Sequence, residues 1–247
     1  LDLVCVGTAT QTEVEEQVDL MYSLIHQQVD AIVLVPIDSK ALVQPVVEAV
    51  RKGVPVINID IRLDTQLLEQ AGVEVAFVGP DNFAAAYEVG KLLDKKLRNE
   101  DKVAIIEGLT AADNAQQRKR GFIKAIEEKG LRLVASEPAD WETEKAAEVF
   151  QAMWMRYPDL KAVYCSNDAM ALGVLQQMQE KNCYLPVVGF DNDAVMKEFL
   201  STGKLVATAD IFSSQMAVRG IEFALDVLEG KIENRGVHST AYEIIKQ

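Results

Sequence analysis

The feature that most constrains this 247-residue chain is a regular alternation of short apolar runs with longer amphipathic segments. The apolar runs have the length of strands and are too continuous to alternate between a buried and an exposed face, which is typical of parallel strands covered on both sides. The segments between them repeat apolar residues at helical spacing, and several end at Gly or Pro, as helices do. We therefore predict an α/β protein with parallel sheets. The predicted strands are 1–7, 31–36, 54–60, 75–79, 102–108, 131–139, 162–167, 186–191, 205–211 and 241–246, and the clearest helices are 14–28, 40–53, 84–97, 116–130 and 144–158.

The charge of the chain limits its partners. Its formal net charge is −13 and its isoelectric point is about 4.7. Nucleic acid and anionic membrane surfaces are bound through clustered Lys and Arg, so we expect neither as a partner. No run approaches the roughly 18 consecutive apolar residues that a membrane helix needs. A neutral or cationic ligand remains compatible with this composition.

Signatures of catalysis were not found. The three cysteines have no CxxC spacing and there are only two histidines, which leaves little for a metal site or a Ser-His-Asp arrangement. The chain lacks GxGxxG after a strand, GxxxxGK[ST], GxSxG and HExxH. A carboxylate pair such as Asp60 and Asp191 could act on a glycoside, but no pattern sets their separation. We predict a protein that is not an enzyme and that uses no cofactor or metal ion.

Polar residues gather at the carboxyl ends of the predicted strands, where open α/β sheets bind ligands. In VYCSNDAMALG, for example, a strand delivers Asn167 and Asp168 with no spacer before the next helix. Carboxylates accept from two hydroxyl groups, Arg and Asn donate to oxygen atoms, and an aromatic ring covers the C–H face of a sugar. This set favours a neutral polyhydroxylated ligand. The residues at these ends are Asp38, Asp60, Arg62, Asp81, Asn82, Asn114, Arg118, Trp141, Asn167, Asp168, Asp191, Asn192 and Asp210.

Helix capping is the alternative explanation for these residues, because Asp and Asn are common N-caps. We favour capping where the residue directly precedes a helical pattern, and ligand binding where a second polar residue beside it could form the cap. The first group is Asp38, Asp81, Asp168 and Asn192, and the second is Asp60, Asn167 and Asp191.

Six motifs in one order resemble the ribose-type periplasmic sugar-binding proteins of bacterial ABC importers. The motifs are QVDAIVLVPIDSKAL, GVPVINID, FVGPDN, NAQQRKRGF, SNDAMALG and VVGFDND, which begin at residues 28, 53, 77, 114, 166 and 187. The resemblance implies a type 1 periplasmic binding protein fold, with two doubly wound parallel-sheet lobes joined by a three-strand hinge and a ligand cleft between them. It implies that lobe one is 1–80 plus 211–239 and that lobe two is 81–210 plus 240–247.

The resemblance also implies a set of ligand-binding residues. These are the Asp60 and Asp191 carboxylates, the Arg118 guanidinium, the Trp141 ring and the Asn167 amide. A second tier of candidates consists of Asn114, Arg62, Asp210, Val35, Ile61 and Ile211. Three positions depart from the ribose binders, because Val35, Ile61 and Ile211 stand where those proteins carry an Asn, an Arg and a Gln. A site selects hydroxyl groups through its buried polar groups, so we expect a pentose, hexose, deoxy sugar or polyol that need not be ribose.

A further departure concerns the beginning of the chain. Members of this family open with one more strand and helix before the strand that matches residues 1–7. Without that unit the sheet of lobe one would have an unpaired edge. We expect that the first βα unit is missing from the sequence given rather than lost from the natural protein.

Two functional readings follow. The preferred one is an exported protein of the periplasm or cell exterior, acting as a monomer, that binds a small sugar or polyol and delivers it to the membrane permease of an ABC importer. The alternative is the effector-binding core of a LacI-class transcription regulator, and an extracytoplasmic sugar-sensing domain is a variant of the first. A signal peptide upstream would support the first reading, and a helix-turn-helix would support the second.

Overall fold

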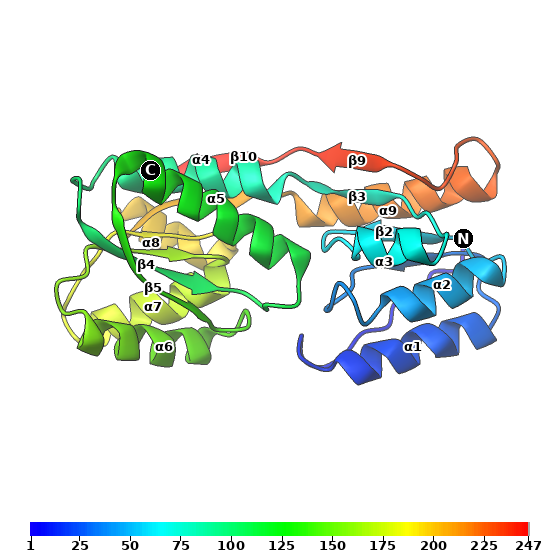
Figure 1. Cartoon of the computed structure of the whole chain (residues 1–247), viewed down its shortest axis with the longest axis horizontal. Helices are drawn as coiled ribbons and strands as arrows, with labels where there is room; N and C mark the ends of the chain where they lie inside the picture. The colour runs from blue at the N-terminus through cyan, green and yellow to red at the C-terminus, as the bar shows by residue number, and fades with distance from the viewer. Residues whose placement is uncertain (247) are drawn as a thin grey trace. The chain divides into compact units, whose positions relative to one another are not determined.

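The computed structural model describes residues 1–246, and these fall into two compact units, each built around one sheet (Figure 1). The predicted α/β class with parallel sheets is confirmed. Unit 1 contains Leu1–Gly79, Ala111–Asp113 and Ser213–Thr240. Unit 2 contains Pro80–Thr110, Asn114–Phe212 and the segment that begins at Ala241.

The sheet of unit 1 has the strand order β1-β2-β3-β9. β1 pairs with β2 and β2 pairs with β3 in parallel, as predicted from their continuous apolar runs. The elements of this unit are α1 (Val14–His26), β1 (Ile32–Leu34), α2 (Val43–Arg51), β2 (Val56–Ile59), α3 (Thr65–Gln70), β3 (Phe77–Pro80), α9 (Ser213–Leu228) and β9 (Val237–Thr240).

Both faces of this sheet are covered by helices. Alternation along β1 and β2 sends Ile32 and Val56 to the cluster that includes α1 and α2, and Val33 and Ile57 to the cluster with α9. Figure 1 shows α1 and α2 on one side of the strands and α9 on the other. Gly220 lets α9 approach closely, because a Cβ atom there would lie 2.8 Å from the Ile59 side chain. The packing on both faces therefore fixes the positions of the carboxyl ends of β1 and β2.

The sheet of unit 2 has the order β10-β8-β7-β6-β4-β5. β10 is antiparallel to β8, and the other pairs are parallel. The elements are α4 (Asn82–Asp94), β4 (Lys102–Glu107), α5 (Asp113–Lys129), β5 (Arg132–Pro138), α6 (Thr143–Arg156), β6 (Ala162–Cys165), α7 (Asp168–Glu180), β7 (Val187–Val188), the 3₁₀ turn η1 (Ala194–Met196), α8 (Lys197–Ser201), β8 (Leu205–Asp210) and β10 (Glu243–Lys246).

The helices of unit 2 form two layers. α4 packs on β7, β8 and β10, while α6 and α7 pack on each other and on strands β4 to β7. Gly121 brings α5 against α4, since a Cβ atom there would lie 2.5 Å from Phe83 O. In Figure 1, α4 and α5 lie on one side of the strands of this unit and α6 and α7 on the other. The arrangement is a doubly wound sheet.

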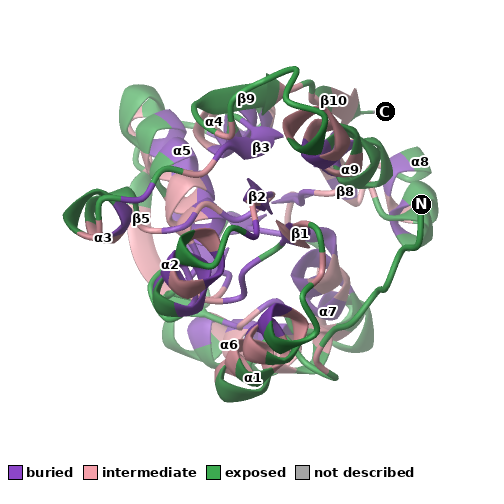
Figure 2. Cartoon of the chain, turned by 90° about the vertical axis from the view of Figure 1, so that its right-hand side faces the viewer, coloured by how far each residue is buried: buried purple, intermediate pink, exposed green. Residues whose placement is uncertain are grey.

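Two strand predictions are wrong. Residues 1–7 form no helix or strand in the structure, and their side chains are exposed (Figure 2). A strand exists only where its backbone pairs with a neighbour, and an apolar run alone does not supply that partner. The second error is β9, which was not predicted because its residues Val237–Thr240 are mostly exposed and carry little apolar signal.

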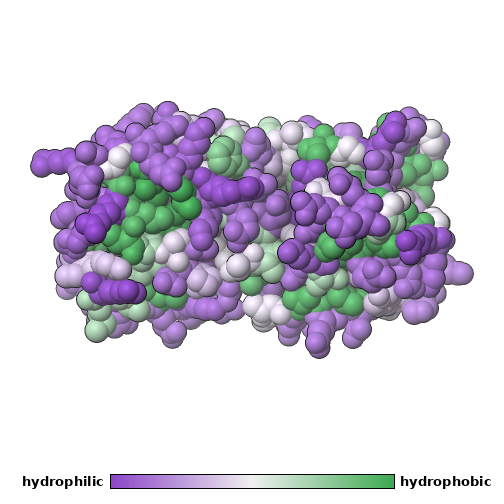
Figure 3. Space-filling model, in the orientation of Figure 1, coloured by the Kyte–Doolittle hydropathy of each residue, from purple (hydrophilic) through white to green (hydrophobic). Residues whose placement is uncertain are grey.

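The face of the protein seen in Figure 3 is mainly hydrophilic, with separate apolar patches. Charged residues make up 26% of the chain, which is close to the usual content of globular proteins. Among the described residues, no helix has the length and the apolar content needed to span a bilayer.

Candidate functional site

Arg118 is the buried centre of a polar cluster in unit 2. Its side chain is 2% exposed on helix α5, one turn after Asn114. Nε donates to Asn82 Oδ1 over 2.9 Å, and Nη1 donates to the Ser166 carbonyl over 2.8 Å. The guanidinium carbon lies 3.7 Å from the centroid of the Phe190 ring. Burying a charge costs several kcal/mol, and these hydrogen bonds and the stacking on Phe190 offset that cost and fix the guanidinium plane.

The Asp191 carboxylate lies beside this guanidinium. Arg118 Nη1 is 3.4 Å from Asp191 Oδ1, and the Asp191 side chain is 29% exposed. Asp191 follows β7 in the loop toward β8 and has a φ of 106°. Non-glycine residues rarely adopt positive φ, and such strain concentrates at functional sites. The pair places a charged donor and a charged acceptor side by side.

The Trp141 ring also lies near Arg118, with its centroid 5.5 Å from the guanidinium carbon. Trp141 is 8% exposed and has a φ of 69°, which is a true outlier for so bulky a residue. Gly108, just after β4, makes room for the ring, because a Cβ atom at Gly108 would overlap it. Trp141 Nε1 is buried and has no hydrogen-bond partner among the described residues. A buried indole N–H usually has a partner, so this donor is available to a ligand.

Two amide side chains flank the cluster. Asn114 is 4% exposed, and its Oδ1 has no hydrogen-bond partner within the described part of the chain. Asn167, next to the Ser166 carbonyl that binds Arg118, accepts from Met170 N over 2.9 Å and forms the N-cap of α7. The cap occupies Oδ1 of Asn167 and leaves Nδ2 as a separate donor.

The capping predictions had mixed outcomes. Asp81 is the N-cap of α4 and accepts from Ala84 N over 2.9 Å, as predicted. Asp38 accepts from Lys40 N and Ala41 N in a turn, but α2 begins only at Val43, so it does not cap that helix.

The capping prediction is wrong for Asn192, whose Nδ2 donates to Asp210 Oδ2 over 2.9 Å. It is also wrong for Asp168. Helix α7 begins at Asp168, and its N-cap is the preceding residue, Asn167. Asp168 is fully buried, and its carboxylate accepts from Thr208 Oγ1 and Asp193 N, each over 2.9 Å. Burial raises the pKa of Asp168 to about 7. Asp168 therefore binds partners from the sheet and from the loop after β7 instead of capping its own helix.

In unit 1, Asp60 follows β2 and has a φ of 62°. The loop around it is held by Asn58, which is 1% exposed. Asn58 Nδ2 donates to Ile61 O over 2.8 Å, and Asn58 Oδ1 accepts from Leu63 N over 2.9 Å. The Ile61 side chain is 3% exposed and belongs to the apolar interior.

The remaining second-tier candidates have other contacts. The Arg62 guanidinium lies 5.6 Å from the Phe77 ring centroid, at a cavity of about 160 Å³ bordered by α3 and β3. Val35 is 39% exposed, and its carbonyl accepts from Gln17 Nε2 over 2.8 Å. In unit 2, Asp210 accepts from Phe212 N over 2.7 Å as well as from Asn192, and Ile211 is 4% exposed.

The structure thus brings three of the predicted residues of unit 2 together, since Arg118 contacts both Asp191 and Trp141. Sequence reasoning missed Phe190 as the platform under Arg118 and Thr208 as the partner of Asp168. Phe190 precedes Asp191 in the motif VVGFDND, and that position was the available signal; Thr208 had none. Among the described residues, no group of three or more His, Cys, Asp and Glu side chains could hold a metal ion.

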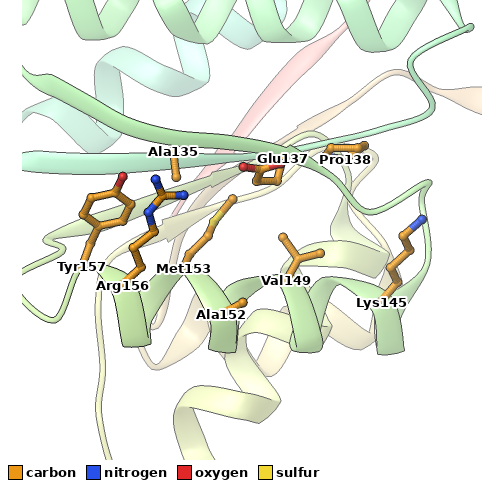
Figure 4. Close-up of a pocket in the computed structure, with 9 residues that line it drawn as sticks. All are labelled: Ala135, Glu137, Pro138, Lys145, Val149, Ala152, Met153, Arg156 and Tyr157. Atoms are coloured by element: carbon orange, nitrogen blue, oxygen red, sulfur yellow. The ribbon is translucent and has the colours of Figure 1, made fainter.

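A separate groove of about 360 Å³ lies between β5 and α6 (Figure 4). Val149, Ala152 and Met153 of α6 form its floor, and the side chains of Ala135 and Glu137 border it from β5. None of the predicted ligand-binding residues lines this groove. It lies along β5, the edge strand of the sheet.

Comparisons with known proteins agree with this geometry. A family model described as a periplasmic binding protein domain matches residues 2–232. The D-ribose/D-allose-binding protein of Pseudomonas aeruginosa is 41% identical, and the match covers 99% of this chain and 78% of that protein. An ABC transporter solute-binding protein from Burkholderia multivorans superposes with a TM-score of 0.95 at 40% identity, covering 99% of this chain and 87% of that one. A periplasmic solute-binding protein from Actinobacillus succinogenes with bound D-allose has a TM-score of 0.88 at 32% identity, covering 94% and 84%.

Proposed function

This chain belongs to the periplasmic binding protein family, and from that membership we propose that it binds a small neutral sugar or polyol and delivers it to an ABC importer. In this proposal the protein is exported to the periplasm or cell exterior, acts as a monomer, catalyses no reaction and has a membrane permease as its partner. The relatives named above are described as ribose- or allose-binding proteins or as solute-binding proteins of ABC transporters. They lend no support to a LacI-class regulator.

The observation that carries the proposal is the environment of Arg118. The guanidinium is held by Asn82 Oδ1, Ser166 O and the Phe190 ring, and its Nη1 lies near a partly exposed Asp191. A sugar hydroxyl can donate to the Asp191 carboxylate and accept from Arg118 at the same time. The Arg118 guanidinium and the Asp191 carboxylate can therefore bind a polyhydroxylated compound together.

Two buried polar atoms of the same cluster point to the same ligand class. Trp141 Nε1 can donate and Asn114 Oδ1 can accept, and neither has a partner among the described residues. Leaving such atoms unsatisfied costs about 1–3 kcal/mol each, so the cost is recovered when a ligand supplies the missing partner. A hydroxyl group satisfies either atom, whereas an apolar ligand satisfies neither.

The proposed ligand-binding set is Asp60 from unit 1 and Asn114, Arg118, Trp141, Asn167 and Asp191 from unit 2. Asp60, Trp141 and Asp191 share a positive φ, which adds weight to their assignment. The apolar side chains of Val35, Ile61 and Ile211 reduce the number of hydrogen bonds compared with a ribose site. Of the three, Val35 is exposed while Ile61 and Ile211 are buried, so we infer that Val35 takes part directly in selecting the sugar or polyol.

The test is calorimetric titration and thermal unfolding with a panel of pentoses, hexoses, deoxy sugars and polyols. A ligand at 1,000 times its dissociation constant adds about 4 kcal/mol to the free energy of unfolding, which is an easily measured rise in melting temperature. Asp191→Ala should weaken binding by roughly 10- to 150-fold and clearly reduce the response, because it removes a charged hydrogen-bond acceptor worth about 1.5–3 kcal/mol. Wild-type protein that responds to no compound in the panel would refute the sugar-binding function.

A further inference from the structure

Asp168 and Thr208 form a buried pair that holds the loop after β7. Thr208 Oγ1 donates to Asp168 Oδ1 over 2.9 Å, and both residues are fully buried. Each also accepts from the backbone of that loop: Asn192 N donates to Thr208 Oγ1 over 3.2 Å, and Asp193 N donates to Asp168 Oδ2 over 2.9 Å. Two consecutive backbone N–H groups are therefore bound by the same pair of side chains.

Asp168 also fixes the residue before this loop. Its backbone N donates to Phe190 O over 2.7 Å, and the Phe190 ring is the one that stacks on Arg118. Gly189 makes this approach possible, because a Cβ atom there would overlap Asp168 Oδ1. One residue thus holds the segment 190–193 at both ends.

The segment needs such an anchor because its backbone is strained. Asp191 has a φ of 106° and Asn192 a φ of 59°. Conformations of this kind cost about 1–3 kcal/mol each and persist only where the surroundings impose them. Asp191 N is held by Ala209 O over 2.7 Å, and the hydrogen bonds to Asn192 and Asp193 complete the restraint.

The pair contributes little that an apolar core would not supply better. A buried carboxylate is expensive to desolvate, and well-packed hydrophobic residues of similar size are often as stable or more so. Burial is the main cause of the raised pKa of Asp168. Proteins keep polar groups that are unfavourable to bury mainly at functional sites. The position of this pair beside the Asp191 loop therefore indicates a role in function.

We propose that Asp168 and Thr208 are positioning residues: without touching the ligand, they hold the Asp191 carboxylate and the Phe190 ring in the arrangement that binds it. This inference rests on the proposed sugar-binding function. It assigns the buried pair a task in the same site, in addition to the residues that contact the sugar.

The matched variants are Thr208→Val, which removes the hydroxyl at nearly constant shape, and Thr208→Ser, which keeps it. Thr208→Val leaves Asp168 Oδ1 and Asn192 N without their partner. We expect it to lower the affinity for the best ligand of the panel by about tenfold or more, equivalent to about 1.4 kcal/mol. Thr208→Ser should recover most of the lost affinity. Equal weakening by the two variants would show that packing, and not the hydroxyl, matters, and would overturn the proposal.

A second arm tests the link to Asp191. In the Asp191→Asn background, Thr208→Val should cause a much smaller further loss of affinity, because residues that act through one another are not additive. A full additional tenfold loss in that background would contradict positioning through Asp191.

A third arm needs no ligand. Amide hydrogen exchange of the ligand-free protein should become faster at Asn192 and Asp193 in Thr208→Val, with Ile105 of β4, a strand paired on both sides, unchanged. Unchanged exchange at both loop amides would refute the anchor itself. If wild-type protein bound no sugar or polyol, the proposed function would fail, while this measurement would still decide whether Thr208 holds the loop.

Discussion

Arg118 Nη1 lies 3.4 Å from Asp191 Oδ1, although the two residues come from helix α5 and from the loop after β7. The parallel order of β4, β6 and β7 brings these segments to the same edge of the sheet. Hydrogen bonds to Asn82 and Ser166 and stacking on Phe190 fix the orientation of the guanidinium before any ligand binds. Preorganisation of this kind lowers the entropy cost of binding.

Arg118→Lys should therefore weaken ligand binding by about a hundredfold. A lysine keeps the charge but loses the planar set of N–H donors and the stacking on Phe190. Isothermal titration with the best ligand measures the change. The control is Arg120→Lys, on an exposed position of the same helix, which should bind as the wild type does. Wild-type affinity in Arg118→Lys would remove the guanidinium from the binding site.

Trp141 offers two separable contributions, the ring face and the Nε1 donor. Trp141→Phe keeps an aromatic face and should cost roughly tenfold in affinity, about the value of one hydrogen bond. Trp141→Ala removes both and should cost more affinity; because the ring is buried, it should also destabilise the fold by about 3–5 kcal/mol, which thermal unfolding measures separately. Affinities from calorimetry rank the three proteins. If Trp141→Phe binds as tightly as wild type, Nε1 does not contact the ligand, and if Trp141→Ala does so, the residue is not in the site.

Gly108 is required for the placement of Trp141, since an added Cβ atom would overlap the indole ring. We expect Gly108→Ala to displace the ring and to reduce ligand affinity about tenfold, because misplaced contacts lose most of their value. In a Trp141→Ala background the same change should have almost no further effect. Gly7→Ala is the control, since a Cβ atom there has no neighbour within 4 Å. A Gly108→Ala protein with unchanged affinity would contradict the dependence of the site on ring position.

Because the pKa of Asp168 is raised, we predict that the free energy of unfolding depends on pH. Its pKa is raised from 3.8 to about 7, first by burial, with Asp193 as a further cause, and it also faces the Cys165 thiol. A raised pKa means that the contribution of this group to stability is complete below the unfolded value near 4 and is lost as pH rises through about 7. Compared with Asp168→Asn, the wild type should lose a few kcal/mol of unfolding free energy between pH 4 and pH 8.

Denaturant unfolding of both proteins at several pH values measures this difference. Asp168→Asn is a suitable comparison because its amide can accept from Asp193 N and donate to Thr208 Oγ1, so the network is retained without the charge. A difference in unfolding free energy that stays constant across this range would show that Asp168 keeps an ordinary pKa.

Local chemistry explains how much of the site was predictable. Short local patterns placed Asp60, Arg118, Trp141, Asn167 and Asp191 among the polar residues at strand ends. The resemblance to sugar-binding proteins then singled out these five from the longer set. The choice between Asn167 and Asp168 as the cap of α7 was not predictable in this way. The structure assigns the cap to Asn167, because Asp168 finds partners in Thr208 and Asp193, which are distant in the sequence.

The sequence by itself determined the alternation of strands and helices, the parallel sheets and the polar residues at the strand ends. These follow from periodicity, apolar content and turn chemistry, which act between neighbours along the chain. Only the tertiary structure decided that residues 1–7 pair with no strand, that Val237–Thr240 form β9, and that Phe190 lies beneath Arg118. The physical reason is that strand pairing and side-chain stacking require a partner from elsewhere in the chain, and no local pattern specifies which partner arrives.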